Sequence, residues 1–300
     1  MPYPAPILET LAGPRPAFEV FEPQRQTTPL VFSSPHSGRA YPLSLMEATR
    51  LKGAAIRRSE DLFVDRLFDF APALGAPLVV AHFPRAYVDV NREPYELDPR
   101  MFDKELPTYA NTGSARVAGG LGTIPRIVAE RQEIYPGRID RDEALARIET
   151  IYHPFHAALG ELLRRTVSAF GIAVLVDCHS MPSTVRALPG RRRPDIVLGD
   201  RFGTSAAPRI VAMAMERLSA LGWEVARNKP YAGGYITEKY GRPRSGIHVI
   251  QLELNRSLYA DEESLLPHPA FDEVREQLRT FASFFSAEID AELDRPAAAE

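Results

Sequence analysis

The chain has 300 residues, of which 45% are hydrophobic and 25% charged, and its net charge is −3. A chain of this length can bury a large core, about three quarters of the surface that its unfolded state exposes. The small negative charge excludes an overall basic field that would attract nucleic acid or an anionic lipid surface. No apolar run approaches the ~18 residues of a membrane-spanning helix, so we expect neither nucleic acid nor a membrane as a partner.

Strand-like and helical patterns alternate along the chain. Apolar stretches of strand length occupy 29–36, 77–83, 85–91, 172–179, 195–200, 223–228 and 247–255. Apolar residues recur at helical spacing in 57–71, 141–170, 204–221 and 270–292. This alternation predicts a layered α/β domain. The segment 93–135 has weak periodicity, and we expect a long ordered loop region there, where functional residues often lie.

Neither a linker nor a repeat divides the sequence, so we expect a single catalytic domain over residues 1–300. The ends, about 1–16 and 294–300, are rich in Pro and Ala and are expected to be loosely ordered. The N-terminal sequence lacks the basic start and apolar core of a signal peptide. With Cys178 as its one cysteine, the chain can form no internal disulfide. These features favour a cytoplasmic protein, and they leave its oligomeric state undetermined.

Polar residues that suit a metal or a substrate stand at the ends of four predicted strands. They are His36 in SSPHSG, Asn91 and Arg92 in VDVNREP, His179 in DCHS, and Glu253 in QLELNR. Open α/β sheets bind ligands at the carboxyl ends of their strands. A carboxylate between apolar neighbours in a central strand is costly to bury without a partner. The sequence therefore predicts one site at this edge of the sheet.

Two histidines and a carboxylate, with a fourth position left for water, are the ligand set of a catalytic zinc site. The acidic ligand is expected in RRSEDLFVDRLF, where Glu60 and Asp61 begin an amphipathic helix. The alternative is that these two residues complement the helix dipole. No H-E-x-x-H motif is present, and a single histidine is more often structural, as we expect for His248 in the core. The metal prediction therefore rests on the convergence of the strand ends.

Several segments resemble the N-formylglutamate amidohydrolase family, in the same order, from about residue 29 to 263. They are SSPHSG, SEDLFVDRLF, VDVNREPYELDPRMF, GLGTIPR, IYHPFH, DCHSMPS, NKPYAGGYITEKYGRP and HVIQLELNRSLYADE. The resemblance implies a three-layer α/β/α fold with a mixed, largely parallel sheet, like that of zinc carboxypeptidases. It also implies zinc-dependent hydrolysis of N-formyl-L-glutamate to formate and L-glutamate, a late step of histidine degradation.

The resemblance also implies which residues bind the metal. His36 and His179 match the two histidine ligands of one zinc ion. The resemblance favours Asp61 as the acidic ligand, with Glu60 as the alternative. Asp177 is expected to orient a ligand histidine, as carboxylates commonly do around bound metals.

Further residues are expected to act on the substrate, some by resemblance and others by their chemistry alone. Glu253 matches the catalytic carboxylate, which would take a proton from water and deliver it to the departing amine. Arg85 is a candidate to stabilise the oxyanion. Asn91 and Arg92 resemble the pair that holds a substrate carboxylate in zinc carboxypeptidases. Tyr235, in GGYITEKYG, is expected to contact the substrate from a flexible lid, for which an ordinary Gly-rich turn is the alternative. Glutamate has two carboxylates, so a second cation is expected from Arg85, Arg116 or Arg242.

Three alternative functions stay open. The first alternative is a zinc-dependent deacylase of another N-acyl amino acid. In the second case it is a serine hydrolase that uses Ser33, Ser34, Ser37 or Ser180, although the sequence contains no G-x-S-x-G elbow. In the third case it is a non-catalytic binding protein on the same fold.

Overall fold

The computed structural model describes residues 5–129, 132–185 and 192–293. Its segments form two compact units, each assembled from three parts of the chain. One unit contains Met1–Val20, Pro35–Asp61 and Val79–Leu159, and the other contains Phe21–Ser34, Leu62–Leu78 and Gly160–Glu300. The single catalytic domain expected over residues 1–300 stays a prediction. The extreme ends of the chain, 1–4 and 294–300, lie outside the described residues.

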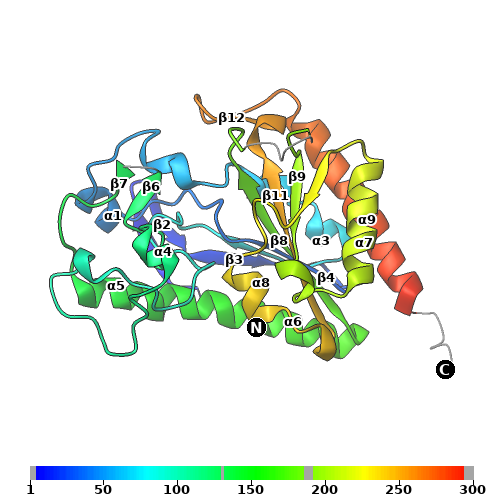
Figure 1. The fold of residues 1–300 in the computed structure, drawn as a ribbon, viewed down its shortest axis with the longest axis horizontal. Helices are drawn as coiled ribbons and strands as arrows, with labels where there is room; N and C mark the ends of the chain where they lie inside the picture. The colour runs from blue at the N-terminus through cyan, green and yellow to red at the C-terminus, as the bar shows by residue number, and fades with distance from the viewer. Residues whose placement is uncertain (1–4, 130–131, 186–191, 294–300) are drawn as a thin grey trace. The chain divides into compact units, whose positions relative to one another are not determined.

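The central element is a seven-stranded sheet with the strand order β10–β9–β11–β8–β4–β5–β3 (Figure 1). Its strands are β3 (Phe18–Phe21), β4 (Leu30–Ser34), β5 (Leu78–Ala81), β8 (Ala173–Met181), β9 (Ile196–Gly199), β10 (Val225–Arg227) and β11 (Ile247–Asn255). Strand β8 pairs in parallel with both β4 and β11, and β10 pairs in parallel with β9, whereas β9 and β11 are antiparallel. The fold is therefore α/β with a mixed, mostly parallel sheet, as predicted.

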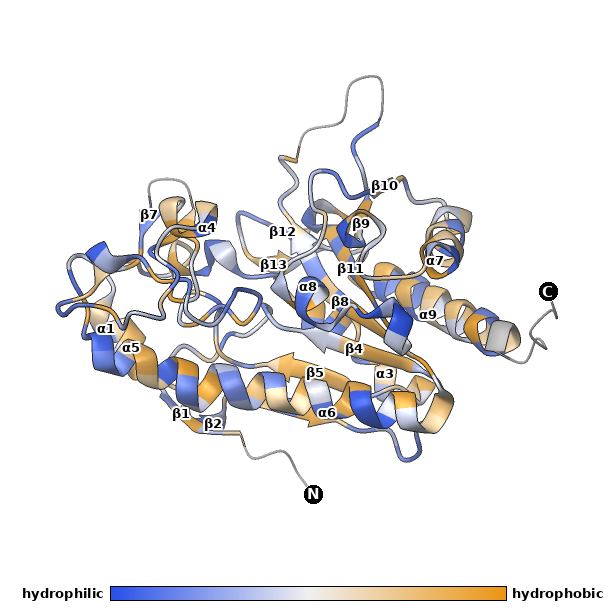
Figure 2. Ribbon diagram, turned by 60° about the horizontal axis from the view of Figure 1, so that its bottom comes forward, coloured by the Kyte–Doolittle hydropathy of each residue, from blue (hydrophilic) through white to orange (hydrophobic). Residues whose placement is uncertain are grey.

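Long helices supply the remaining core around these strands. Helices α7 (Pro208–Ala220) and α9 (Phe271–Leu293) lie side by side (Figure 1). Figure 2 shows the central strands as mainly hydrophobic, whereas these helices carry both hydrophobic and hydrophilic residues. Such a distribution lets one helix face pack inward while the other meets water. None of the helices in the described part of the chain is long and apolar enough to cross a membrane.

The predicted helix 141–170 is one continuous helical run. It consists of α5 (Arg141–Arg147), a π-helical turn (Ile148–Tyr152) and α6 (His153–Phe170). Asp140 caps the run, because its side chain accepts a hydrogen bond from the backbone N–H of Glu143. Within it, Phe155 packs edge-on against Phe18 of β3, with the ring centroids 5.7 Å apart. The helical periodicity of this segment therefore predicted its structure correctly.

The remaining elements are short. They are β1 (Ile7–Thr10), β2 (Gly13–Pro16), α1 (Leu43–Ala48), α2 (Val64–Leu67), α3 (Ala71–Leu74), α4 (Ala115–Ala118), β6 (Ile127–Ala129), β7 (Gln132–Glu133), α8 (Tyr235–Tyr240), β12 (Ala260–Asp261) and β13 (Leu266–Pro267), with 3-10 turns at Ile56–Ser59, Pro99–Met101, Arg201–Gly203, Pro243–Ser245 and Arg256–Leu258. In the expected loop region 93–135, the described residues carry only such short elements.

Three expectations differ from the structure. Residues 7–16, expected to be loosely ordered, form the antiparallel hairpin β1–β2. The predicted helix 57–71 is divided into short turns, because Phe63 adopts a left-handed backbone conformation with φ 56°. The predicted strand 85–91 is an irregular buried segment. There the Asp89 carboxylate accepts the backbone N–H of Asn91 and turns the chain, as short polar side chains often do.

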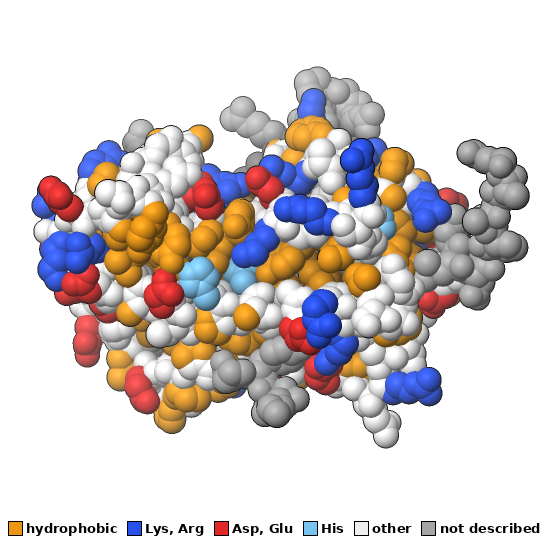
Figure 3. Space-filling model, turned by 90° about the horizontal axis from the view of Figure 1, so that it is seen from below, with side chains coloured by type: hydrophobic (Ala, Val, Ile, Leu, Met, Phe, Trp, Pro, Cys, Tyr) orange, Lys and Arg blue, Asp and Glu red, His pale blue; other side chains and the backbone are white. Residues whose placement is uncertain are grey.

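Charged side chains of both signs are distributed over the surface shown in Figure 3. Lys and Arg as well as Asp and Glu side chains appear there, and hydrophobic and neutral groups lie between them. This face therefore presents no field of a single sign, which agrees with the net charge of −3.

Candidate functional site

The predicted metal ligands His36, Asp61 and His179 lie together. One ligand atom from each residue, a ring nitrogen or a carboxylate oxygen, lies within 4.8 Å of the other two. All three residues are buried, with at most 3% of their surface exposed. Two imidazoles and a carboxylate are the donor set of a catalytic zinc site. The three side chains therefore fit a single metal ion.

His36 is oriented by two carboxylates. Its Nε2 lies 2.7 Å from Oδ1 of Asp89, and its Nδ1 lies 3.5 Å from Oδ2 of Asp61. The backbone N–H of Asp61 also donates to the carbonyl of His36, at 3.0 Å. A carboxylate on one ring nitrogen commonly fixes the tautomer of a histidine that binds metal through the other. In this arrangement Nδ1, on the side of Asp61, is the atom that would bind the metal.

Asp89 is a site residue that the sequence analysis missed. Its Oδ2 accepts a hydrogen bond from Nη2 of Arg85 at 2.6 Å and lies 3.7 Å from Nη2 of Arg92. Burial alone would raise the pKa of Asp89, but the positive charges of these arginines lower that pKa well below its usual value. Asp89 therefore carries the negative charge that holds His36. A sequence signal existed, since Asp89 stands two residues before Asn91 in VDVN.

Arg92 is held with its guanidinium in a defined orientation. Its Nε donates to the carbonyl of Leu121 and its Nη1 to the carbonyl of Asn91, both at 2.8 Å. Burial lowers the pKa of Arg92, and the Asp89 carboxylate opposes that shift. A guanidinium fixed in this way is preorganised for a planar acceptor such as a carboxylate.

Glu60 and Asp61 are adjacent but have different partners. Both oxygens of Glu60 are bonded by Arg57, through Nε at 2.9 Å and Nη2 at 2.8 Å, and Tyr41 donates to Oε1 at 2.6 Å. Burial, followed by the charge of Glu60, raises the pKa of the Tyr41 phenol. The structure thus places Asp61 in the cluster with the histidines and Glu60 in an ion pair with Arg57.

His179 and Glu253 occupy neighbouring positions on the two central strands. The parallel register of β8 and β11 pairs His179 with Glu253 and Asp177 with Gln251. Nε2 of His179 lies 3.0 Å from Oδ2 of Asp177, so the carboxylate expected to orient a ligand histidine is bonded to one. Glu253 is 8% exposed, and its Oε1 accepts a hydrogen bond from Nε2 of Gln251 at 2.8 Å.

Tyr235 is the first residue of helix α8. The ammonium group of Lys239 lies 5.6 Å from the centre of its ring. Arg242, one of the candidates for a second substrate anchor, donates to the carbonyls of Glu238 and Gly241 at 2.8 and 2.7 Å. Arg242 thus satisfies the C-terminal carbonyls of α8. The segment expected to be a flexible lid or a Gly-rich turn contains helix α8 (Tyr235–Tyr240), and its role as a lid stays a prediction.

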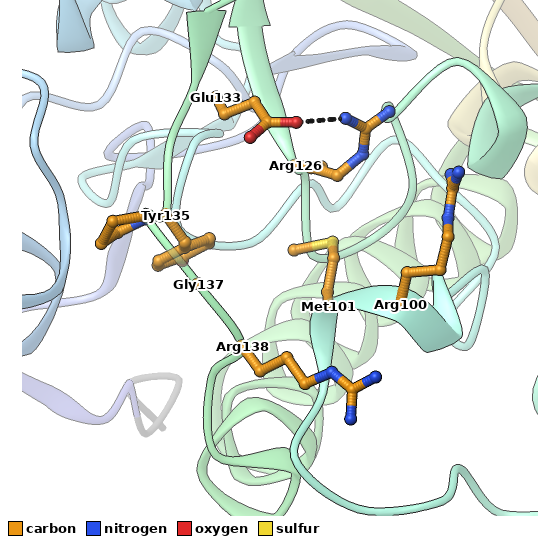
Figure 4. Close-up of a pocket in the computed structure, with 8 residues that line it drawn as sticks. Arg100, Met101, Arg126, Glu133, Tyr135, Gly137 and Arg138 are labelled. Carbon is orange, nitrogen blue, oxygen red and sulfur yellow. Dashed lines mark hydrogen bonds and ion pairs between the residues drawn. The ribbon is translucent and has the colours of Figure 1, made fainter.

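A separate pocket lies beside the β6–β7 hairpin (Figure 4). It has a volume of about 290 Å³ and is lined by Arg100, Met101, Arg126, Glu133, Tyr135, Pro136, Gly137 and Arg138. Nη1 of Arg126 donates to Glu133 at 2.6 Å, and its Nε lies 3.4 Å from Oδ2 of Asp98. The charges at Arg126 are therefore balanced locally. None of the predicted site residues lines this pocket.

Known proteins resemble this chain over most of its length. Residues 28–260 match the model of the N-formylglutamate amidohydrolase family. The N-formylglutamate deformylase of Pseudomonas aeruginosa is 32% identical over 250 residues, which cover 82% of this chain and 87% of that protein. The N-formylglutamate deformylase of Pseudomonas putida is 32% identical over 241 residues, which cover 78% of this chain and 82% of that protein.

Solved structures also resemble this chain over most of its length. The N-formylglutamate amidohydrolase of Ralstonia eutropha JMP134 superposes with a TM-score of 0.86 at 31% identity, over 92% of this chain and 99% of that one. A protein from Agrobacterium tumefaciens superposes with a TM-score of 0.64 at 18% identity, over 91% and 94%, and shares the fold. The fold and these comparisons define a hydrolase of the α/β class that contains a candidate metal centre. The chain belongs to the N-formylglutamate amidohydrolase family, which confirms the resemblance seen in its sequence.

Proposed function

We propose that this protein uses one zinc ion to hydrolyse the amide bond of N-formyl-L-glutamate, which yields formate and L-glutamate. The observation that carries the proposal is the buried cluster of His36, Asp61 and His179, with Glu253 paired to His179 across the sheet. The relatives named N-formylglutamate deformylase, at 32% identity, support the choice of substrate. When bound, zinc would supply a Lewis acid that polarises a carbonyl and lowers the pKa of water.

Glu253 would act as the proton carrier. It accepts a proton as water attacks the formyl carbon, and it donates that proton to the amine nitrogen as the carbon–nitrogen bond breaks. Its place beside His179 supports this role, because a proton carrier must reach the water near the metal ligands. A carboxylate at a buried position with one oxygen bonded by Gln251 is also well oriented for the transfer.

Arg85 and the Asn91–Arg92 pair would bind the negative charges of the reacting substrate. Arg85 would donate to the oxygen of the formyl group as negative charge develops on it. Its bond to Asp89, which in turn holds His36, supports a position close to the metal ligands. Arg92 would hold a substrate carboxylate through its planar guanidinium.

Tyr235, at the start of α8, would contact the part of the substrate that is not reacting. The helix packs on β11, the strand of Glu253. A substrate contact from α8 would therefore be made by a residue with a defined position.

The test is the metal content of the purified protein together with formate release from several N-formyl amino acids. We expect about one zinc ion per chain, release of formate from N-formyl-L-glutamate, and loss of activity with a chelator that is restored by zinc. N-formylglycine and N-acetylglutamate should be poorer substrates. Preference for either one would assign a different deacylase. Inhibition by a fluorophosphonate but not by the chelator would assign a serine hydrolase, and binding without turnover would assign a binding protein.

A further inference from the structure

We propose that Gln251 is a positioning residue that holds the Glu253 carboxylate and connects it to the start of helix α8, where Tyr235 lies. The inference rests on the proposed function, because that function makes Glu253 the proton carrier. It adds to the site a residue that would act through Glu253 and not on the reacting bond itself.

Both ends of the Gln251 amide are used. Gln251 is 4% exposed, and its side chain lies on the same face of β11 as that of Glu253, since residues two apart in a strand share a face. Its Nε2 donates to Oε1 of Glu253, and its Oε1 accepts the backbone N–H of Gly234, both at 2.8 Å. Exchanging the two amide ends would place oxygen against oxygen and N–H against N–H. The two partners therefore determine the orientation of the amide.

The backbone before α8 is held close to the sheet at this point. Gly199 of β9 is the register partner of Gln251. A Cβ atom at Gly199 would lie 2.7 Å from the carbonyl carbon of Ala232 and from the nitrogen of Gly233, so only glycine permits this approach. The backbone N–H of Arg201 also donates to the carbonyl of Ala232, at 2.7 Å. The contact between Gly234 and Gln251 is therefore part of a fixed arrangement.

Two adjacent strands contain the same kind of side-chain contact, a hydrogen bond between residues two apart in one strand. On β8, Asp177 bonds His179, two residues further along, at 3.0 Å. On β11, Gln251 bonds Glu253, again two residues further along, at 2.8 Å. The register places the two pairs beside each other. In each pair the first residue would orient the second, which is the metal ligand on β8 and the proton carrier on β11.

This arrangement matters for the rate because proton transfer requires an exact position of the carboxylate. A misplacement of about 1 Å in an active site can cost on the order of 100-fold in rate. The amide donor of Gln251 restricts the orientation of the Glu253 carboxylate, and its loss would make the position facing the attacking water less well defined. The bond from Gln251 keeps one oxygen in place and so determines where the other one points.

Two variants separate the two bonds of Gln251. Gln251→Glu keeps an oxygen for the N–H of Gly234 but replaces the donor to Glu253 with a second carboxylate. Gln251→Met has a similar length and makes neither bond. We expect kcat for N-formyl-L-glutamate to fall by roughly 10–100-fold in both variants. This is the usual loss when a residue that orients a ligand or a catalytic side chain is replaced. KM should rise in Gln251→Met alone, because only that variant removes the hydrogen bond that holds the backbone N–H of Gly234 at the start of α8.

A double-mutant cycle tests whether Gln251 acts through Glu253. In a Glu253→Gln background, Gln251→Met should cause no further fall in kcat, since the carboxylate to be positioned is absent. Gln26→Met is the matched control, because the amide of Gln26 bonds Thr28 and Thr166 within the fold. It should lower Tm and leave kcat and zinc content unchanged.

The outcomes distinguish the inference from the function on which it rests. An unchanged kcat in both Gln251 variants, or losses that multiply in the double variant, would overturn the positioning role while the wild-type protein still releases formate. A wild-type protein that hydrolyses no N-acyl amino acid would overturn the proposed function and this inference with it. Zinc content and Tm, measured on every variant, show whether a loss of kcat comes from unfolding.

Discussion

Glu253 on β11 lies directly beside His179 on β8 in a parallel register that extends from Ile247 to Asn255. Both side chains project from the same face of the sheet, because register partners in adjacent parallel strands share a face. The pairing therefore brings a carboxylate to a metal-ligand candidate without any loop, and both residues stand in long strands whose other residues are almost all buried.

Glu253→Gln tests the proton-transfer role. Glutamine is nearly isosteric and can still bond Gln251, but it cannot accept a proton from water. We expect kcat to fall by about 10²–10⁴-fold, the usual contribution of a general base, with zinc content and Tm close to those of the wild type. A variant that loses stability but keeps its turnover per folded molecule would make Glu253 a structural residue.

The adjacent acids Glu60 and Asp61 should respond differently to substitution. Asp61→Ala removes a ligand candidate, so tightly bound zinc and activity should be lost together. Glu60→Ala should retain zinc but lower the free energy of unfolding by about 1.5–3 kcal/mol, because it removes the charged acceptor of Arg57 and Tyr41 while the Arg57 side chain stays partly open to water. Metal analysis and urea unfolding of both variants provide the measurement. Zinc loss in Glu60→Ala alone would make Glu60 the ligand.

Asp89→Asn tests the residue that the sequence analysis missed. An amide at this position removes the negative charge shared by His36 and Arg85, so His36 loses its fixed orientation. We expect zinc affinity to fall by about 10–100-fold, as for other carboxylates behind a metal ligand. Competition with a chelator of known affinity measures this change. Asp98→Asn is the control, because Asp98 is a buried carboxylate that bonds Arg100; equal zinc affinities in the two variants would contradict the assignment.

Arg92→Lys tests the substrate anchor. Lysine keeps the charge but loses the planar fork that binds a carboxylate through two hydrogen bonds. We expect kcat/KM for N-formyl-L-glutamate to fall. The lost transition-state stabilisation should be about 1.5–3 kcal/mol, the value of a hydrogen bond to a charged group. Hydrolysis of a neutral N-formyl amide should change little. Arg92 also bonds Leu121 and Asn91, so an equal loss on both substrates would indicate that it supports the fold instead.

His248 should make the stability depend on pH. As expected for a core histidine, its Nδ1 accepts the backbone N–H of Ala207 at 3.1 Å, which requires the neutral ring. Burial, assisted by the charge of Arg209, lowers the pKa of His248 from 6.5. At a pH between 6.5 and this lowered pKa, the His248 side chain binds a proton in the unfolded chain but not in the folded chain. The free energy of unfolding should therefore fall as the pH decreases below about 6.5.

His248→Asn keeps an acceptor for Ala207 but does not titrate. Urea unfolding of both proteins at about pH 7.5 and about pH 5.5 should show a smaller difference between the two pH values in the variant. The same pH dependence in both proteins would mean that other groups cause it.

The sequence by itself predicted the parts of the fold whose signal is local. The apolar run 172–179 corresponds to β8, and the stretch 247–255 coincides with β11. Such strands are buried on both faces, so their composition is sufficient to identify them. Helix periodicity likewise predicted the run 141–170. The convergence of strand ends brought His36 and His179 into one predicted site, because the carboxyl ends of parallel strands meet at one edge.

The tertiary structure alone decided features that depend on partners far away in the sequence. Residues 85–91 alternate like a strand, yet Asp89 bonds His36 and Arg85 instead of taking part in the sheet. Periodicity could not choose between Glu60 and Asp61, because the choice depends on where Arg57 and Tyr41 lie. No pattern in the sequence indicated the hydrogen bond between the Gln251 side chain and the backbone of Gly234. Hydrogen bonds of side chains are short-ranged and directional, so a one-dimensional pattern shows which residues can make them but not which partners the fold supplies.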